Sequence, residues 1–157
     1  FLHDSAGEDQ QTDGHDVLDN ATFFSRLTRR LIGILTMHTS TGKLYEVDIR
    51  LRPSGRSGLM VSSLAAFEQY QRDDAWTWEH QALLRARAVA GDASVKAAFE
   101  QLRVRVLRDY VRREGLREEV ANMRARMRAE LAAGTPELLD LKQDEGGITD
   151  IEFLVQY

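Results

Sequence analysis

The sequence of 157 residues predicts an α+β protein in which a sheet-bearing region precedes a helical one. Three observations lead to this class. Charged and apolar side chains alternate through residues 45–52, as in a strand with one polar face. Apolar residues recur at helical spacing through residues 23–35, and residues 75–134 contain three helix-like segments. We therefore expect two parts, residues 1–62 and residues 63–157.

The first part begins with the end of a strand at residues 1–2. Residues 3–16 are polar and acidic and include glycine, which predicts a solvated loop. A helix follows, and either Asp19 or Asn20 can serve as its N-cap.

Turn chemistry at residues 39–43 leads from this helix into the alternating strand. The strand is expected to end at Pro53, because proline has no N–H group to donate to a ladder. A glycine-containing loop at residues 53–58 and a short strand at residues 59–61 complete the first part.

The second part is predicted to open with a helix capped by Ser62 or Ser63. Three further helices are expected, and the first of them is closed by a glycine; they cover residues 75–92, 93–113 and 117–134. The last helix follows a Gly-Gly turn, where Thr149 and Glu152 match the capping-box pattern.

Composition restricts the function classes. The formal net charge of −4 argues against bulk nucleic-acid binding. The absence of cysteine excludes disulfides and thiolate metal sites and fits a reducing cytoplasm. No apolar run reaches the roughly 20 residues of a membrane helix. The chain starts with Phe1 and stops at Tyr157 inside an apolar segment, so we expect a fragment.

The alternating strand places Asp48, Arg50 and Arg52 on one face. A solvated sheet face with cross-strand ion pairs would have the same pattern. The functional alternative is a site for Mg²⁺ and a triphosphate, with Asp48 as a metal ligand and the arginines on phosphate oxygens.

Further candidate ligands for phosphate lie in the second part. Arg85 and Arg87 are either ion-paired surface residues or contacts to a phosphate. Lys142 and Asp150 flank the Gly-Gly turn, where they either contact a ligand or, in the case of Asp150, stabilise the start of a helix.

Three stretches resemble one family when taken in order, and together they extend over almost the whole chain: GKLYEVDIRLRPSGRSGLMV, AWTWEHQALLRARAVAGD and KQDEGGITDIEFLVQY. They are similar to the glutamine synthetase adenylyltransferases. This family has two nucleotidyltransferase halves, of which one attaches AMP to glutamine synthetase and the other removes it. The AWTWEHQAL wording resembles the adenylylating, C-terminal half.

The resemblance implies a polymerase-β-like nucleotidyltransferase sheet, truncated here, followed by a helical domain. Asp48 matches the third carboxylate of that fold and would bind Mg²⁺ and accept the tyrosine proton. Arg50 and Arg52 would balance phosphate charge of ATP, with Arg85, Arg87 and Lys142 as further contacts. The D-x-D pair of the family is expected upstream of residue 1, so the isolated chain is expected to be inactive.

The resemblance also implies partners and a location. Glutamine synthetase would be the substrate, a PII-type signalling protein a partner, glutamine an effector and the cytoplasm the location. Two alternatives remain open, namely phosphorolytic deadenylylation by the homologous half and a non-catalytic helical interaction module. Neither nucleic acid nor a membrane is expected as a partner.

Overall fold

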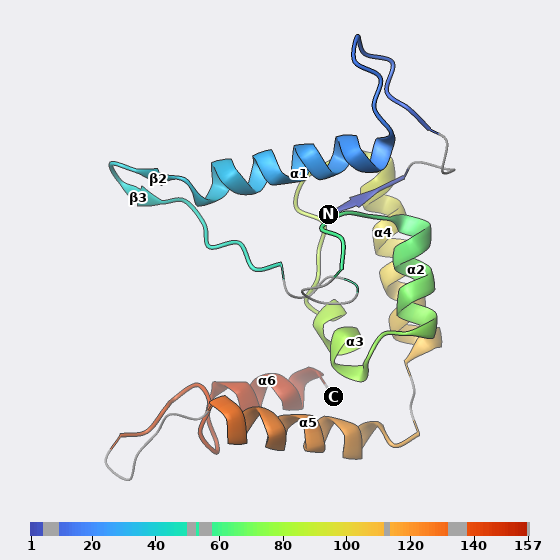
Figure 1. Cartoon of the computed structure of the whole chain (residues 1–157). Coiled ribbons are helices and arrows are strands. Elements are labelled where there is room, and N and C mark those ends of the chain that lie inside the picture. Colours follow the sequence, from blue (N-terminus) through green and yellow to red (C-terminus); the bar gives the residue numbers. More distant parts are fainter. Residues whose placement is uncertain (5–9, 50–52, 54–57, 112–113, 132–137, 157) are drawn as a thin grey trace. The chain divides into compact units, whose positions relative to one another are not determined.

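The computed structural model describes residues 1–4, 10–49, 53, 58–111, 114–131 and 138–156, and its helices and strands are shown in Figure 1. They form two compact units. Unit 1 comprises Phe1–Asp74 and Ala88–Leu102, and unit 2 comprises Ala75–Arg87 and Arg103–Tyr157. Strands and helices are both present, which confirms the α+β class. The predicted division at residue 62 concerns catalytic domains and stays a prediction.

A short parallel sheet joins the two ends of the sheet-bearing region in unit 1. Strand β1 (Leu2–His3) pairs with β4 (Ser62–Ser63), in the register Leu2↔Ser62 and His3↔Ser63. The predicted strand at the start of the chain is confirmed. The prediction of a strand at residues 59–61 was wrong in its position, because the ladder with β1 is formed by Ser62 and Ser63.

Helix α1 (Asn20–Thr36) begins as the sequence predicts. The carboxylate of Asp19 accepts a hydrogen bond from the N–H of Thr22 (2.8 Å), so Asp19 is the N-cap. The chain then turns back through a tight hairpin of β2 (His38–Thr39) and β3 (Gly42–Lys43). Gly42 has a φ of 104°, a value that side chains disfavour, which explains the glycine in this turn.

The core of unit 1 is built around α2 (Leu64–Asp73), whose N-cap is Ser63. The Ser63 hydroxyl accepts a hydrogen bond from the N–H of Ala66 (3.1 Å), as predicted. Phe67 is buried and packs against Phe99 of α4 (Ala93–Arg105), with ring centroids 6.3 Å apart.

In unit 2, α3 (Thr77–Leu83) is much shorter than the predicted helix of residues 75–92, so that prediction was wrong. The N–H groups of Leu84 and Arg85 bond carbonyls only three residues back, which tightens and ends the helix. The Asp92 carboxylate accepts a hydrogen bond from the Ser94 N–H (2.7 Å), so α4 has its own start signal.

The remaining helices of unit 2 are the π-helix η2 (Val106–Tyr110), α5 (Leu116–Leu131) and α6 (Ile148–Gln156). Val106 is completely buried, and Leu83 and Val120 are nearly so. The burial of polar and charged side chains is costly unless they are hydrogen-bonded. The buried polar and charged residues of unit 2 include Glu79, His80, Gln81, Arg124 and Thr149. None of the described helices combines the length and apolar character needed to cross a membrane.

Candidate functional site

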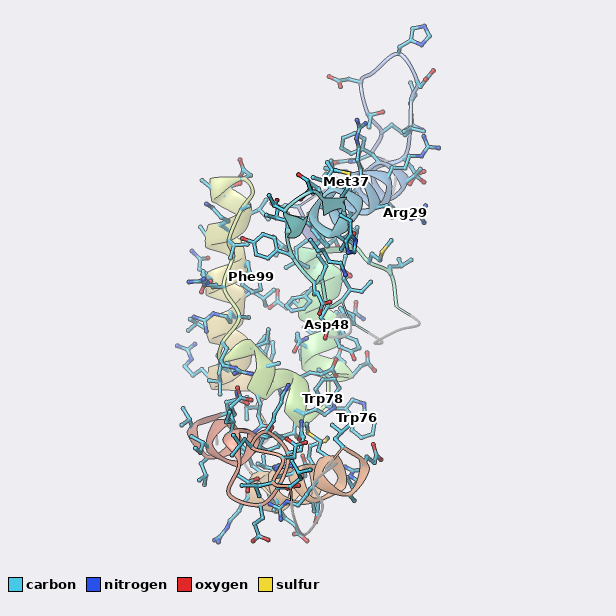
Figure 2. The ribbon with its side chains drawn as sticks, turned by 90° about the vertical axis from the view of Figure 1, so that its left-hand side faces the viewer. Arg29, Met37, Asp48, Trp76, Trp78 and Phe99 are labelled. Atoms are coloured by element: carbon cyan, nitrogen blue, oxygen red, sulfur yellow. The ribbon has the colours of Figure 1, made fainter. Side chains whose placement is uncertain are left out.

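Asp48, the predicted catalytic carboxylate, lies in unit 1 on the segment that follows β3 (Figure 2). The segment is attached to α1 by a hydrogen bond from the Tyr45 N–H to the Leu35 carbonyl (3.0 Å). Asp48 is exposed. Lys43 and Glu46 form an exposed ion pair at 3.6 Å, which contributes little to stability.

The strand expected at residues 45–52 is not formed in its described part. Residues 45–49 have an irregular conformation and take no part in a sheet ladder. A strand requires a hydrogen-bonded neighbour, and alternation of side chains does not supply one. Arg50 and Arg52, the predicted phosphate contacts, lie outside the described residues.

The donor set for Mg²⁺ is incomplete among the described residues. Mg²⁺ usually binds one or two carboxylates together with phosphate oxygens and water. Asp48 supplies one carboxylate, and no group of three or more His, Cys, Asp or Glu side chains in the described ranges has a metal-binding arrangement. These residues alone therefore do not fit a complete magnesium site.

The other predicted ligand contacts, Arg85, Arg87 and Lys142, lie in unit 2. Arg85 binds the Glu152 carboxylate at 2.7 Å, with both side chains substantially exposed. This ion pair joins the WTWEHQALLRAR motif to the GGITDIEF motif. Arg87 is exposed. It was expected within a helix, but it lies beyond the end of α3.

Lys142 belongs to a turn that we call the Gly-Gly loop (residues 140–147). The loop is folded by its own polar groups. The Asp140 carboxylate accepts hydrogen bonds from the N–H groups of Lys142 (2.9 Å) and Gln143 (3.1 Å). The Lys142 carbonyl accepts a hydrogen bond from Thr149 N–H (3.1 Å) in α6. The Lys142 backbone is thus fixed on both sides, while its side chain is exposed.

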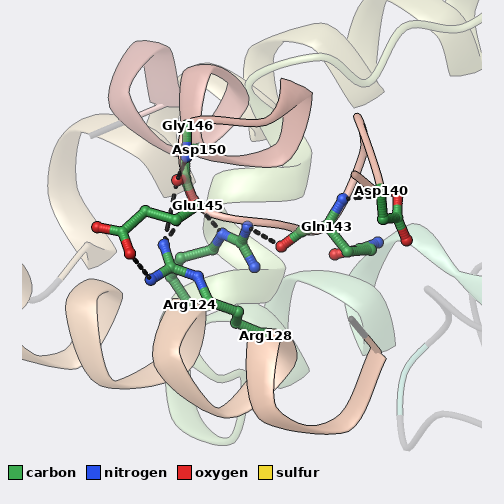
Figure 3. Close-up of polar contacts among 7 residues, drawn as sticks. All are labelled: Arg124, Arg128, Asp140, Gln143, Glu145, Gly146 and Asp150. Atoms are coloured by element: carbon green, nitrogen blue, oxygen red, sulfur yellow. Dashed lines mark hydrogen bonds and ion pairs between the residues drawn. The ribbon is translucent and has the colours of Figure 1, made fainter. Parts of the chain in front are cut away.

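A polar cluster of Arg124, Arg128, Gln143, Glu145 and Asp150 ties this loop to α5 (Figure 3). Arg124 donates from Nε to the Asp150 carboxylate and from Nη2 to the Gln143 carbonyl (2.7 Å). Arg128 also binds Asp150, at 3.1 Å, and approaches Glu145 at 3.6 Å. Two guanidinium groups from successive turns of α5 therefore share one carboxylate.

Asp150 is stabilised as an anion by this arrangement. Its carboxylate accepts a hydrogen bond from the Gly146 N–H (2.7 Å), which is the main reason that the pKa of Asp150 lies below its ordinary value. Burial acts in the opposite direction, and the bonds from Arg124 and Arg128 add to the lowering.

The start of α6 differs from the predicted capping box. Thr149 is buried in the first turn of the helix and does not precede it. Asp150, and not Glu152, reaches back to the turn before the helix. The Thr149–Glu152 capping box was therefore wrong, because Glu152 is ion-paired with Arg85.

Arg124 and Arg128 of α5 were not singled out from the sequence alone. Their spacing of four residues puts them on one helix face. This spacing does not show whether that face is buried or exposed. The partner, Asp150, lies 26 and 22 residues away, and that separation hides the pairing from local patterns.

Comparisons with known proteins were consistent with the sequence resemblance. A family model described as glutamate-ammonia ligase adenylyltransferase matches residues 1–102. Three relatives, each named bifunctional glutamine synthetase adenylyltransferase/adenylyl-removing enzyme, match 100% of this chain. They come from Thioalkalivibrio sulfidiphilus (59% identical), Hahella chejuensis (52%) and Pseudomonas putida (54%). The chain spans 16 to 17% of their length.

Proposed function

Because the chain belongs to the glutamate-ammonia ligase adenylyltransferase family, we propose that the full-length protein containing it transfers AMP from ATP to a tyrosine of glutamine synthetase. The observation that carries this proposal is the similarity of the entire chain to relatives whose names include this activity. The transfer would regulate nitrogen assimilation in the cytoplasm. A PII-type signalling protein and glutamine are its proposed regulators, on the basis of the family resemblance alone.

In the proposed reaction, the tyrosine hydroxyl oxygen attacks the α-phosphorus of ATP. A new oxygen–phosphorus bond forms, the bond to pyrophosphate breaks, and the hydroxyl proton passes to a base. Asp48 is the proposed base and also one carboxylate ligand of a polymerase-β-like site for Mg²⁺, an ion that neutralises triphosphate charge when bound. The remaining carboxylates would come from the full-length protein.

The proposed contacts to the triphosphate are cations. Arg50 and Arg52 follow Asp48 closely in the sequence. Arg85 is paired with Glu152 at the surface, and such exposed pairs are weak enough for a phosphate to replace the carboxylate. Arg87 and Lys142 have exposed side chains and complete the proposed set.

The substitution Asp48→Asn in the full-length protein tests the catalytic proposal. We expect it to lower the rate of AMP transfer to glutamine synthetase by about 100-fold or more, because the amide neither binds Mg²⁺ as well nor accepts the proton. The matched control is Glu46→Gln, which removes an exposed charge two residues away and should keep the rate. An Asp48→Asn enzyme that retained full activity with Mg²⁺ and ATP would refute the role of Asp48.

A second candidate reaction is the phosphorolytic removal of AMP, which the second half of the relatives' name suggests. In this reaction inorganic phosphate attacks the tyrosine-bound AMP, and ADP leaves. Assays of Asp48→Asn with ATP and unmodified synthetase, and with phosphate and adenylylated synthetase, separate the two. Loss of only the first activity assigns Asp48 to the adenylylating half, as the AWTWEHQAL wording suggests. If neither activity changes but synthetase binding requires the helices, this chain is an interaction module.

A further inference from the structure

We propose that Arg124 is a positioning residue that sets the place of Lys142 for binding the triphosphate of ATP. The inference rests on the proposed function, in which the Lys142 side chain contacts the nucleotide. Arg124 itself touches no substrate in this account. It acts through the Gly-Gly loop, which it holds against α5.

Burial and geometry single out Arg124 from the other arginines of α5. Its side chain is only 8% exposed, whereas that of Arg128 is 35% exposed. A buried guanidinium group requires well-aligned acceptors, since the loss of hydration is costly. Arg124 has two such acceptors on the segment opposite, the carboxylate of Asp150 and the carbonyl of Gln143.

The Gln143 carbonyl is the important contact, because Gln143 directly follows Lys142. The Asp140 carboxylate holds the N–H of Lys142, and Thr149 holds its carbonyl. Arg124 fixes the next carbonyl along the chain at 2.7 Å. Three points of attachment thus determine the direction in which the Lys142 side chain leaves the backbone.

The planar guanidinium group is suited to this role. Its fork of N–H donors serves two acceptors in fixed directions, whereas the ammonium group of lysine acts as a point charge. Arg124→Lys therefore keeps the buried positive charge and removes the simultaneous hold on Asp150 and Gln143. The substitution isolates geometry from charge.

The test uses the full-length enzyme and steady-state kinetics with ATP and glutamine synthetase. We expect Arg124→Lys to raise the KM for ATP by about 10-fold while kcat changes less than about twofold, because the cation that binds ATP is displaced and the reacting groups are not. Lys142→Ala should raise the same KM. The double variant should be no worse than Lys142→Ala alone, since Arg124 acts through Lys142.

Two further variants complete the design. Arg126→Lys is the matched control, since Arg126 is exposed on the same helix, and its KM should equal that of the wild type. Asp150→Asn loosens the same contact without altering Arg124 and should raise the KM for ATP by about threefold. This second variant keeps the test decisive if Arg124→Lys does not fold. The rate of hydrogen exchange of the Gly-Gly loop amides should increase in Arg124→Lys and in Asp150→Asn, and it should not change in Arg126→Lys.

The outcomes distinguish this inference from the function on which it rests. A raised KM in Lys142→Ala with a normal KM in both Arg124→Lys and Asp150→Asn would overturn the role of Arg124 and leave that of Lys142 intact. A normal KM in Lys142→Ala would refute the role of Lys142 and the positioning inference together. Neither result depends on Asp48, which Asp48→Asn tests separately.

Discussion

Two segments that carry predicted nucleotide contacts are built in different ways. Residues 44–49 follow the β2–β3 hairpin in an irregular conformation, with Leu44 and Tyr45 more than 60% exposed. The Gly-Gly loop is closed by hydrogen bonds that the carboxylates of Asp140 and Asp144 accept from backbone N–H groups, and by a hydrogen bond that Arg124 of α5 donates. Residues 44–49 have the alternating composition of a strand without its ladder, whereas the Gly-Gly loop has the hydrogen bonds of a turn.

The difference shows which kinds of structure a short sequence can specify by itself. Asp, Asn and Gly shape turns through bonds to the backbone a few residues away. A strand needs a partner that the same stretch of sequence does not contain. Local chemistry therefore specifies most of the Gly-Gly loop, to which Arg124 adds long-range contacts. The segment around Asp48 depends on contacts from elsewhere for any strand structure.

The largest expected effect on this contrast comes from Gly147→Ala. A Cβ atom at this position would lie 2.8 Å from the Leu141 carbonyl oxygen and 2.9 Å from that of Asp144. Both atoms belong to the backbone of the loop, so they cannot move without breaking its hydrogen bonds. We expect the local free energy of opening of the loop to fall by about 2 kcal/mol, measured by hydrogen exchange of residues 140–149 in the full-length protein.

The control for this substitution is Gly14→Ala, because nothing lies within 4 Å of a Cβ atom built at Gly14. Unchanged exchange in the Gly147→Ala loop would show that its backbone adjusts easily. The loop would then be no more rigid than residues 44–49, and the contrast between the two segments would disappear.

Asp150→Asn should have a smaller and pH-dependent effect on the loop. We expect a loss of roughly 1.5 kcal/mol near neutral pH, because the amide bonds the guanidinium groups and the Gly146 N–H less strongly. The pKa of Asp150 is lowered in the folded state, so its stabilising contribution is complete above the ordinary value of 3.8. The contribution is lost as the pH falls below 3.8 and through the lower folded pKa.

Hydrogen exchange from pH 7 to pH 3, corrected for the intrinsic rate at each pH, measures this effect. The wild type and Asp150→Asn should differ most at pH 7 and pH 5, and the difference should narrow as the pH falls below 3.8. A constant difference over the whole range would mean that the charge of Asp150 is not what holds the loop.

Much of the fold was predictable from local signals. The sequence offered Asp19 or Asn20 and Ser62 or Ser63 as N-caps, and the structure selects Asp19 and Ser63. The predictions for residues 75–92 and for the described part of the strand, residues 45–49, failed for a common reason. Both rested on a periodic pattern of side chains, which indicates neither where the backbone hydrogen bonds change nor which segment would pair with a strand.

The candidate site was predictable only in part. The motifs identified Lys142 and Asp150, but not the pairing of Asp150 with Arg124 and Arg128, which depends on the approach of α5. The sequence left open whether Arg85 forms a surface ion pair or contacts a phosphate, and the structure shows it ion-paired with Glu152. Both pairings are between residues more than 20 positions apart, and a single sequence does not reveal such contacts.

The smallest expected effect concerns Gly33, which is exposed within α1, the helix that holds the segment around Asp48 through Leu35. Nothing lies within 4 Å of a Cβ atom built there. Alanine favours the helix over glycine, so Gly33→Ala should stabilise α1 by about 1 kcal/mol. Slower amide hydrogen exchange in residues 30–36 would show this stabilisation. The change in exchange rate would be opposite in sign to that expected for Gly147→Ala.

The sign of this effect also reports on the surface of α1 in the full-length protein. Several apolar side chains of this helix are about 40% exposed or more, including Phe23, Leu27 and Leu31. If the region beside Gly33 is open, alanine adds only helix propensity and stabilises. If another part of the full-length protein packs closely against Gly33, the added methyl group must destabilise. Faster exchange in Gly33→Ala would therefore show that α1, and with it the support of the Asp48 segment, is packed against another part of the full-length protein.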